Sequence, residues 1–257
     1  MSAVEAPRRT AIVTGAGTGI GRAAALELAR RGWTVALFGR TARTLEETAS
    51  VIRAAGGEAV TLPCDVTRAD EVTDAFARVG ERFGRIDLLF NNAGSFGPQA
   101  RVDELSDADW QAVLAVNVTG SLLCAREAFR RMREQDPQGG RIINNGSVSA
   151  HRPRPRSAAY AITKHAVTGL TRSIALDGRP FGVTATQIDI GNAATELLAG
   201  IGDDAGALQA DGSRRREPSF DVAHAARLIA DVADLPLDVA VHELVVTATG
   251  MPYDGRG

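Results

Sequence analysis

Two side chains of scarce types lie four positions apart near the middle of the chain. Lys164 is the only lysine among 29 basic residues, and Tyr160 is one of two tyrosines. Positions i and i+4 of a helix share a face, so the phenol and the ammonium would lie side by side. An ammonium favours the phenolate and lowers the pKa of a tyrosine, which suits general acid and base catalysis. Taken alone, such a pair is more often part of a solvated helix surface.

A glycine-rich segment, Gly15-Ala-Gly-Thr-Gly-Ile-Gly21, offers a second kind of chemistry. It lies between an apolar, β-branched run at 10–14 and a helix-forming segment at 20–31. Glycines permit a tight turn and close backbone approach, and the start of the helix offers N–H groups to a pyrophosphate. This predicts a dinucleotide site, with a purely structural turn as the alternative. No Gly-Lys-Ser/Thr follows, which excludes an ATP-type P-loop.

The end of the next apolar run, 33–38, bears on the choice of cofactor. A Rossmann site for NAD would place Asp or Glu here to hold the ribose 2′-hydroxyl, but the residues are Gly39 and Arg40. A carboxylate would repel a 2′-phosphate, whereas a guanidinium can bind it through two hydrogen bonds. We therefore predict NADP(H) as the favoured cofactor, with NAD(H) possible. A merely solvated Arg40 is the alternative.

Five motifs follow one another along the chain: Thr14 to Gly21, Asp65-Val66, Asn91-Asn92-Ala93-Gly94, Val116-Asn117-Val118, and Ser147 thirteen residues before Tyr160 and its partner Lys164. In their order and spacing they resemble the short-chain dehydrogenase/reductase family from about residue 8 to the C-terminus. By this resemblance the cofactor site holds Gly15, Thr18, Gly19, Ile20 and Gly21 in the turn, Asp65 and Val66 at the adenine, Asn92, Ala93 and Gly94 after the fourth strand, and Tyr160 and Lys164. The catalytic residues would be Asn117, Ser147, Tyr160 and Lys164.

The resemblance implies transfer of a hydride between the nicotinamide C4 and a carbonyl or alcohol carbon. Tyr160 would protonate the carbonyl oxygen or deprotonate the alcohol, and Ser147 would hydrogen-bond that oxygen. Lys164 would lower the pKa of Tyr160 and bind the nicotinamide ribose, and Asn117 would hold a water that links the lysine to solvent. Outside this pattern, Ser147 and Asn117 would be a turn hydroxyl and a helix-bending amide.

The chain departs from the family pattern after its sixth predicted strand. The usual Pro-Gly becomes Ile190-Gly191, preceded by Asp189, which we interpret as a buried, hydrogen-bonded carboxylate rather than a substrate group. Gly191 and Thr195 still match the cofactor pattern. Thr195 is predicted to contact the pyrophosphate or the carboxamide, or else to cap a helix. A smaller departure is Asn145-Gly146-Ser147, where the family often has Ile-Ser-Ser; the serine hydroxyl is retained.

Three arginines at 152, 154 and 156 lie between the serine and the tyrosine. They could attract an acidic substrate, or they could point into water from a segment held extended by prolines. The same alternatives apply to Arg214-Arg215-Arg216. That triplet ends a polar, glycine-broken stretch, and we predict that residues 193–216 form a substrate lid, with a plain surface connection as the alternative.

These residues require a scaffold in which strands alternate with helices. Apolar runs predict strands at 10–14, 33–38, 58–63, 86–90, 141–144, 183–190 and 241–247, and helices near 20–31, 42–55, 68–83, 107–134 and 157–177. Because the strands are apolar on both faces, they suit a covered parallel sheet. We predict an α/β fold, a doubly wound parallel sheet of Rossmann type with about seven strands, as one domain over residues 1–257.

Composition limits the partners. The 29 basic and 31 acidic residues give a net charge of −2, too weak a field to gather nucleic acid or an anionic membrane. No apolar run approaches the roughly 18 residues that span a bilayer, and the N-terminus lacks an apolar signal core. Cys64 and Cys124 are isolated, so we expect buried thiols and no metal site. We expect a cytoplasmic protein, and the family resemblance suggests a homotetramer or homodimer built on the helices near 107–134 and 157–177.

Other functions stay open at this stage. A protein on this fold could sense the cofactor ratio or bind a partner without turnover, although it would not need the proton relay. A dehydratase or epimerase would leave no net change in free cofactor. The substrate, a small carbonyl or alcohol compound, is not identified, because the segments 94–102, 149–156 and 193–216 that would line its pocket are the least predictable from one sequence.

Overall fold

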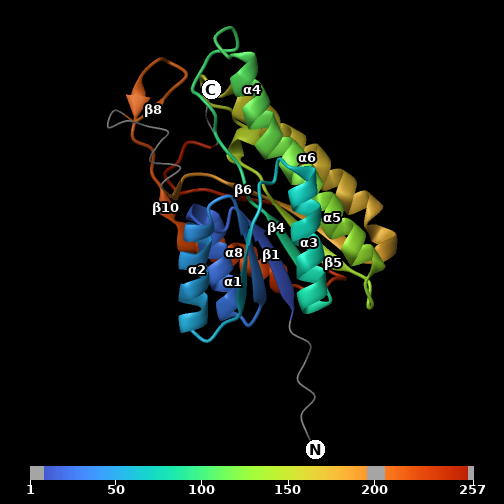
Figure 1. Ribbon diagram of the computed structural model, residues 1–257. Coiled ribbons are helices and arrows are strands. Elements are labelled where there is room, and N and C mark those ends of the chain that lie inside the picture. Colours follow the sequence, from blue (N-terminus) through green and yellow to red (C-terminus); the bar gives the residue numbers. More distant parts are fainter. Residues whose placement is uncertain (1–8, 196–205, 254–257) are drawn as a thin grey trace, which may run out of the picture.

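The structure, a computed structural model, describes residues 9–195 and 206–253. Its centre is a parallel sheet of seven strands in the order β11-β6-β5-β4-β1-β2-β3 (Figure 1). The strands are β1 (Thr10–Thr14), β2 (Thr34–Gly39), β3 (Ala59–Pro63), β4 (Leu88–Asn91), β5 (Gly140–Asn145), β6 (Val183–Ile190) and β11 (Glu243–Val246). The strand order reverses beside β1, which creates the crevice where such sheets bind ligands. The predicted fold class is confirmed.

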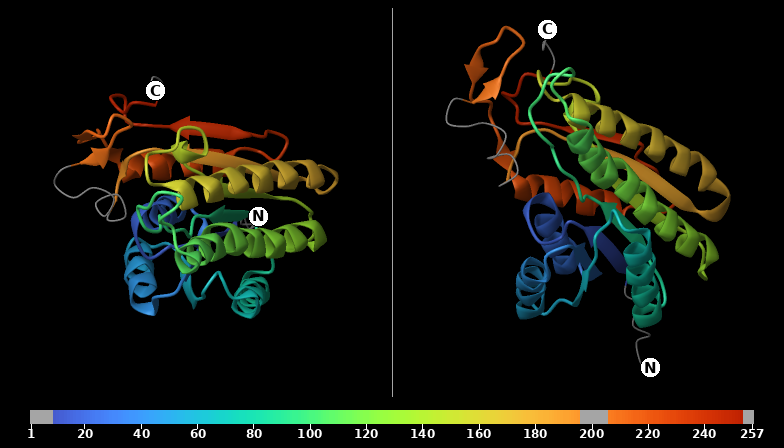
Figure 2. Two further views of the ribbon diagram at one scale, coloured as in Figure 1. Left: turned by 90° about the horizontal axis from the view of Figure 1, so that it is seen from above. Right: turned by 45° about the horizontal axis from the view of Figure 1, so that its top comes forward.

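Helices cover both faces of the sheet (Figure 2). One face carries α1 (Gly19–Arg30), α2 (Ala42–Ala54) and α8 (Val222–Asp234), and the other carries α3 (Ala69–Phe83), α5 (Ser121–Glu134) and α6 (Ala158–Asp177). Two hydrophobic cores result. Along β1, Ala11 and Val13 point into the first core and Ile12 into the second. This alternation explains why the three central residues of the strand are all apolar.

The helix expected over 107–134 consists of three parts. Ser106 is the N-cap of α4 (Asp107–Leu114), and its Oγ accepts a hydrogen bond from the Asp109 backbone N–H at 3.1 Å. A π-helical turn, η1 (Ala115–Gly120), then leads into α5. By length and composition this helical stretch could cross a membrane, contrary to the expectation that no segment approaches that limit. Half of its most apolar window is buried inside the fold, which is the packing of a core helix.

Helix α8 is absent from the elements expected from the sequence. It begins at Asp221, whose carboxylate accepts a hydrogen bond from the Ala223 backbone N–H at 2.9 Å. The buried face of α8 contains Ala225, Ala226, Ile229 and Ala230, and it packs against α1. The apolar residues of α8 recur at helical spacing, so the sequence carries the signal of this helix, and the small alanine side chains permit close packing of the two helices.

The predicted lid is only partly described. Its residues 196–205 lie outside the described residues. Before them, β7 (Ala193–Ala194) pairs with β10 (Phe220–Asp221), and after them β8 (Ala207–Leu208) pairs with β9 (Arg214–Arg215) as a short hairpin. Strand pairing thus connects residues 193–194 to the start of α8. Two short 3-10 turns, η2 (Val148–Ala150) and η3 (Arg179–Phe181), flank α6.

Candidate active site

The glycine-rich turn after β1 has little room for side chains. Gly15 and Gly19 have positive φ angles of 66° and 53°, which glycine adopts without steric cost. A Cβ on Gly21 would lie 2.2 Å from the Gly15 carbonyl oxygen, and one on Gly17 would lie 2.3 Å from Thr44 Oγ1. The turn leads into the N-terminus of α1, where the first N–H groups of a helix have no acceptor within it. This is the geometry of a phosphate cradle.

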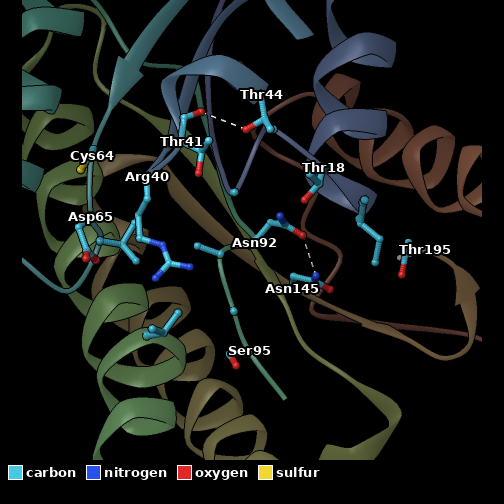
Figure 3. A pocket seen from close by; sticks show the side chains of 18 of the residues that line it. Thr18, Arg40, Thr41, Thr44, Cys64, Asp65, Asn92, Ser95, Asn145 and Thr195 are labelled. Atoms are coloured by element: carbon cyan, nitrogen blue, oxygen red, sulfur yellow. Dashed lines mark hydrogen bonds between the residues drawn. The ribbon is translucent and has the colours of Figure 1, made fainter. Parts of the chain in front are cut away.

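A cavity of about 330 Å³ lies against this turn (Figure 3). It is lined by Gly15, Gly17, Thr18, Gly19, Ile20, Arg40, Thr41, Thr44, Cys64, Asp65, Val66, Asn92, Ala93, Gly94, Ser95, Val116, Asn145, Tyr160, Lys164 and Thr195. The structure therefore brings together almost every residue that the sequence assigned to a cofactor. Of that set, Gly21 lies beneath the turn against Gly15, and Gly191 lines a neighbouring cavity.

The two ends of the cavity differ in chemistry. Figure 3 shows Arg40 and Asp65 at one end and Thr18 and Thr195 at the other. The exposed Arg40 side chain reaches in from the end of β2 and makes no ion pair with the described residues. Asp65 Oδ1 instead accepts hydrogen bonds from the backbone N–H and the hydroxyl of Thr67, at 2.9 and 2.8 Å. Asp65 thus fixes the turn before α3.

The Asn-Ala-Gly motif after β4 is tied to β1 through one hydroxyl. Thr14 Oγ1 accepts hydrogen bonds from the backbone N–H groups of Asn92 and Ala93, at 2.8 and 2.9 Å. The Asn92 side chain donates to the Thr14 carbonyl at 2.9 Å and accepts from Asn145 Nδ2 at 2.9 Å. These bonds hold the carboxyl ends of β1, β4 and β5 together at the floor of the cavity. Thr14 and Asn145 are functional-site residues that sequence reasoning did not assign.

Asn117 lies in the π-helical turn η1 and is buried. Its Oδ1 accepts a hydrogen bond from the Ser95 backbone N–H at 2.8 Å, and its Nδ2 donates to the Ser95 carbonyl at 2.8 Å and to Thr163 Oγ1 at 3.0 Å. Asn117 therefore joins three elements: η1, the loop after β4, and α6. Turns of π-helix frequently occur at functional sites.

Tyr160 and Lys164 extend from one face of α6 toward the cavity, as their spacing predicts. Lys164 Nζ lies 5.5 Å from the centre of the Tyr160 ring and donates a hydrogen bond to the Asn145 carbonyl at 2.7 Å. The lysine is buried, with 5% of it exposed. The Phe96 ring packs on Tyr160 with 4.5 Å between ring centres. The alternative of a solvated helix surface is thereby excluded for this pair.

Burial dominates the acidity of both groups. It raises the pKa of Tyr160 to about 12, against a smaller lowering by a hydrogen bond with Ser147 and by the charge of Arg154. Burial also lowers the pKa of Lys164 to about 8, while the Asp189 carboxylate opposes that change. The expectation that the lysine brings the pKa of Tyr160 down is thus not met: burial raises this pKa, and the groups that oppose the rise are Ser147 and Arg154.

Ser147 follows β5 and faces a second cavity of about 80 Å³. Its Oγ accepts a hydrogen bond from the Ser149 backbone N–H at 3.1 Å, and its own N–H donates to Asp189 Oδ1 at 2.7 Å. The lining includes Phe96, Ser147, Val148, Arg154, Tyr160, Gly191, Asn192 and Thr195. Four residues line both cavities: Ile20, Asn145, Tyr160 and Thr195. A small molecule bound in the second cavity would therefore contact Ser147 and Tyr160 and would lie next to a ligand bound in the first cavity.

Comparison with known proteins decides the family. The sequence model described as short chain dehydrogenase matches residues 9–206. The chain belongs to the short-chain dehydrogenase family. A relative from Mediterraneibacter gnavus, named a 3beta-hydroxysteroid dehydrogenase, is 40% identical over 177 residues. The match covers 69% of this chain but only 63% of that relative, less than two thirds of its length.

Solved structures of this family match nearly the whole chain. An alcohol dehydrogenase from Thermococcus sibiricus, complexed with 5-hydroxy-NADP, has a TM-score of 0.82 at 27% identity and covers 95% of this chain and 98% of its own. A 3-ketoacyl-(acyl-carrier-protein) reductase from Brucella melitensis, complexed with NADH, has a TM-score of 0.82 at 25% identity, with 94% and 97% covered. This short-chain dehydrogenase is thus an oxidoreductase with the fold of enzymes that bind nicotinamide cofactors of either kind.

The arginines near the second cavity of this short-chain dehydrogenase differ from one another. Arg152 and Arg156 are exposed, and Arg156 forms an ion pair with Glu104. Arg154 is instead turned inward, where it pairs with the buried Glu217 and donates to Asn192 Oδ1 at 2.7 Å. The interpretation as solvated arginines therefore fits two of the three. Arg214 and Arg215 lie on the short hairpin and are exposed.

Both cysteines of this dehydrogenase are buried and unpaired, as expected. Burial raises the pKa of the Cys64 thiol to about 12, and burial raises that of Cys124 as well. Although Cys64 lines the first cavity, its thiol stays protonated at physiological pH. A protonated thiol is a poor nucleophile, so neither cysteine is a candidate for catalysis.

Proposed function

We propose that the chain is an NADP-preferring oxidoreductase that interconverts a ketone and a secondary alcohol through a Ser-Tyr-Lys-Asn proton relay. The observation that supports this best is the pair of adjoining cavities that share Tyr160. One cavity contains the phosphate cradle and Lys164, and the other contains Ser147. A cofactor and a carbonyl group could thus meet at a single phenol.

The residues of the first cavity fit a dinucleotide. A Cβ on Gly21 would collide with the backbone of the turn, so the cradle depends on glycine. Arg40 would bind the 2′-phosphate, Asp65 and Val66 the adenine, and the turn the pyrophosphate. Asn92, Ala93, Gly94, Gly191 and Thr195 would enclose the nicotinamide end. The bound cofactor would supply or accept the hydride.

The chain's own side chains would handle the proton. Tyr160 gives its phenolic proton to the carbonyl oxygen during reduction, or takes a proton from the alcohol during oxidation. Ser147 donates a hydrogen bond to the same oxygen and keeps it beside the phenol. Lys164 supplies a positive charge and binds the cofactor ribose. Asn117 would hold the water that links Lys164 to solvent, and its hydrogen bonds to Ser95 and Thr163 fix its own position.

A panel of ketones and secondary alcohols tests the proposed reaction. We expect oxidation of NADPH with at least one ketone, followed by the loss of absorbance of the reduced nicotinamide. A stoichiometric alcohol product should form, because a dehydratase or epimerase would leave the free cofactor unchanged. Binding of NADPH without turnover across a broad panel would instead favour the cofactor-sensing function.

Replacing Arg40 tests the choice of cofactor. We expect Arg40→Ala to weaken NADPH binding about ten-fold or more, since a charge-assisted contact is worth about 1.5–3 kcal/mol. NADH binding should hardly change. Arg43→Ala is the matched control, because Arg43 is an exposed arginine of α2 paired with Glu47. Fluorescence titration of each variant with both cofactors measures the effect, and tighter binding of NADH than NADPH by the unaltered protein would contradict the proposed preference.

The remaining proposals concern the domain organisation, the oligomeric state and the cellular location. We propose one domain with residues 193–216 as a substrate lid, in a cytoplasmic protein that forms a homotetramer or homodimer. The exposed apolar residues Leu122 on α5 and Ile162 and Leu176 on α6 support association through these helices. Light scattering of the purified protein measures the mass directly. A monomeric mass at micromolar concentration would contradict this part of the proposal.

A further inference from the structure

Asp189 lies near the carboxyl end of β6 and is fully buried, with 0% of it exposed. Its Oδ1 accepts the hydrogen bond from the Ser147 backbone N–H at 2.7 Å. Gln187 Nε2 lies 2.9 Å from each of the two carboxylate oxygens. A carboxylate that remains charged in a protein interior needs donors of this kind. One of its donors is thus the backbone of the proposed catalytic serine.

The other side of Asp189 faces His151. His151 Nε2 lies 2.8 Å from Asp189 Oδ2 and 3.2 Å from Glu243 Oε1. Arg172 approaches the same glutamate at 3.8 Å. Because Ser147 and His151 are the two ends of the segment that contains η2, Asp189 holds this segment at both ends.

The packing around Asp189 also explains a departure from the family pattern. A Cβ on Gly146 would lie 1.9 Å from Asp189 Oδ1. The carboxylate therefore fits only because position 146 is glycine. Gly146 and Asp189 look like two unrelated departures from the family pattern in the sequence. In the structure they pack against each other beside Ser147.

A hydrogen-bonded chain describes this group better than a metal centre does. The ligand atoms of His151, Asp189 and Glu243 lie within 4.8 Å of one another. Both oxygens of Asp189 already accept hydrogen bonds from N–H donors, and a metal ion would have to displace these donors from a buried carboxylate.

We propose that Asp189 is a positioning residue of the active site, which fixes the Ser147–His151 segment so that the Ser147 hydroxyl stays beside Tyr160. The kinetic part of this proposal rests on the proposed function. Its buried charge also acts on the site: the Asp189 carboxylate raises the pKa of Tyr160 and of Lys164, while Arg154 lowers the pKa of Tyr160. Removing the charge should therefore let Tyr160 ionise at lower pH.

The first test needs no substrate, because the chain has only two tyrosines. In a Tyr253→Phe background, the absorbance of tyrosinate reports Tyr160 alone. We expect Asp189→Asn in that background to show more tyrosinate than its parent at any given alkaline pH. Asn keeps an acceptor for the Ser147 N–H. Gln187 Nε2 faces both oxygens of Asp189, so a turn of the Gln187 amide brings its Oε1, which lacks a hydrogen-bond partner among the described residues, toward the new amide. Circular dichroism of the same samples marks where unfolding begins, and only lower pH values are compared.

Glu243→Gln is the matched control, since it removes a charge on the far side of His151 without touching Ser147. We expect it to titrate like the parent. Where a substrate is turned over, Asp189→Ala should lower kcat about ten-fold or more with a smaller change in KM, because it frees the serine segment. Asp189→Asn should retain more of the rate while its pH profile moves to lower pH.

Two results would overturn the proposal: an Asn variant that titrates like its parent, or an Ala variant that folds and keeps full kcat. If the Ala variant does not fold, the titration of the Asn variant decides whether the proposal holds. If no substrate is turned over but the Asn variant shows the tyrosinate shift, the proposed function is contradicted. The effect of the Asp189 charge on Tyr160 is then still supported.

Discussion

Tyr160→Phe should lower the turnover rate by roughly 10²–10⁴-fold and leave NADPH binding within a few-fold of the original value. Only the hydroxyl is removed, so the ring can keep its packing against Phe96. The substrate oxygen would then lack its proton donor, while Ser147 could still bind it. Steady-state kinetics with a substrate from the carbonyl panel, together with a cofactor titration, measure the two effects separately.

Tyr253→Phe is the natural control for this variant, because it removes the only other phenol of the chain. Its ring centre lies 6.4 Å from that of His151, outside the cavity that contains Lys164. We expect its turnover to stay within about two-fold of the original. Near-normal turnover by a folded Tyr160→Phe protein would show that another group supplies the proton.

Lys164→Arg should reduce kcat at least about ten-fold and weaken cofactor binding. On a solvated helix face this exchange would change stability by no more than about 0.5 kcal/mol. Lys164 is buried, however, and its ammonium fits beside the Asn145 carbonyl. A guanidinium is larger and planar, and it cannot release a proton at accessible pH. The compact charge that must reach the ribose would be lost.

The exchange in the opposite direction provides the control. Arg172 is on the same helix with 73% of its side chain exposed, and we expect Arg172→Lys to keep full activity. Melting curves of both variants accompany the kinetics. Unchanged kinetics of a folded Lys164→Arg protein would contradict a catalytic reason for the single lysine, whereas lost turnover in a folded protein would support it.

The sequence predicts the sheet and the cofactor cavity well because both depend on local patterns. Strands such as β1 are apolar on both faces, and the glycines of the turn lie next to the helix that they introduce. Helix α8 also has apolar residues at helical spacing, so it could have been predicted from the same kind of local pattern. The scarcity of lysine and tyrosine is informative for a different reason. All the other basic residues are arginine, so the single lysine marks a position where arginine is not used, and one of the two tyrosines lies four residues before it.

The surroundings of the catalytic groups could not be predicted in the same way. Asp189 contacts Ser147, 42 residues away in the sequence, and His151, 38 residues away, so no local sequence pattern indicates these contacts. The high pKa of Tyr160 results from burial, which depends on Phe96 and the packing of α6. Arg154 is turned inward, unlike Arg152 and Arg156, and it pairs with Glu217, which lies far along the chain from it.

The π-helical turn η1 limits how this part of the chain can change in length during evolution. A π-type hydrogen bond encloses one residue more than an α-type bond, and each residue of an α-helix turns the chain by about 100°. The extra residue of the π-turn offsets this rotation, so Val113 of α4 and Cys124 of α5 keep the relative orientation that they would have in an unbroken α-helix one residue shorter. Both side chains are buried, and deleting one residue from 115–120 would leave both facing the core while it removes the π-turn that contains Asn117. A one-residue deletion is therefore opposed by the candidate site, through the Asn117 hydrogen bonds to Ser95 and Thr163, and not by the packing of the helix itself.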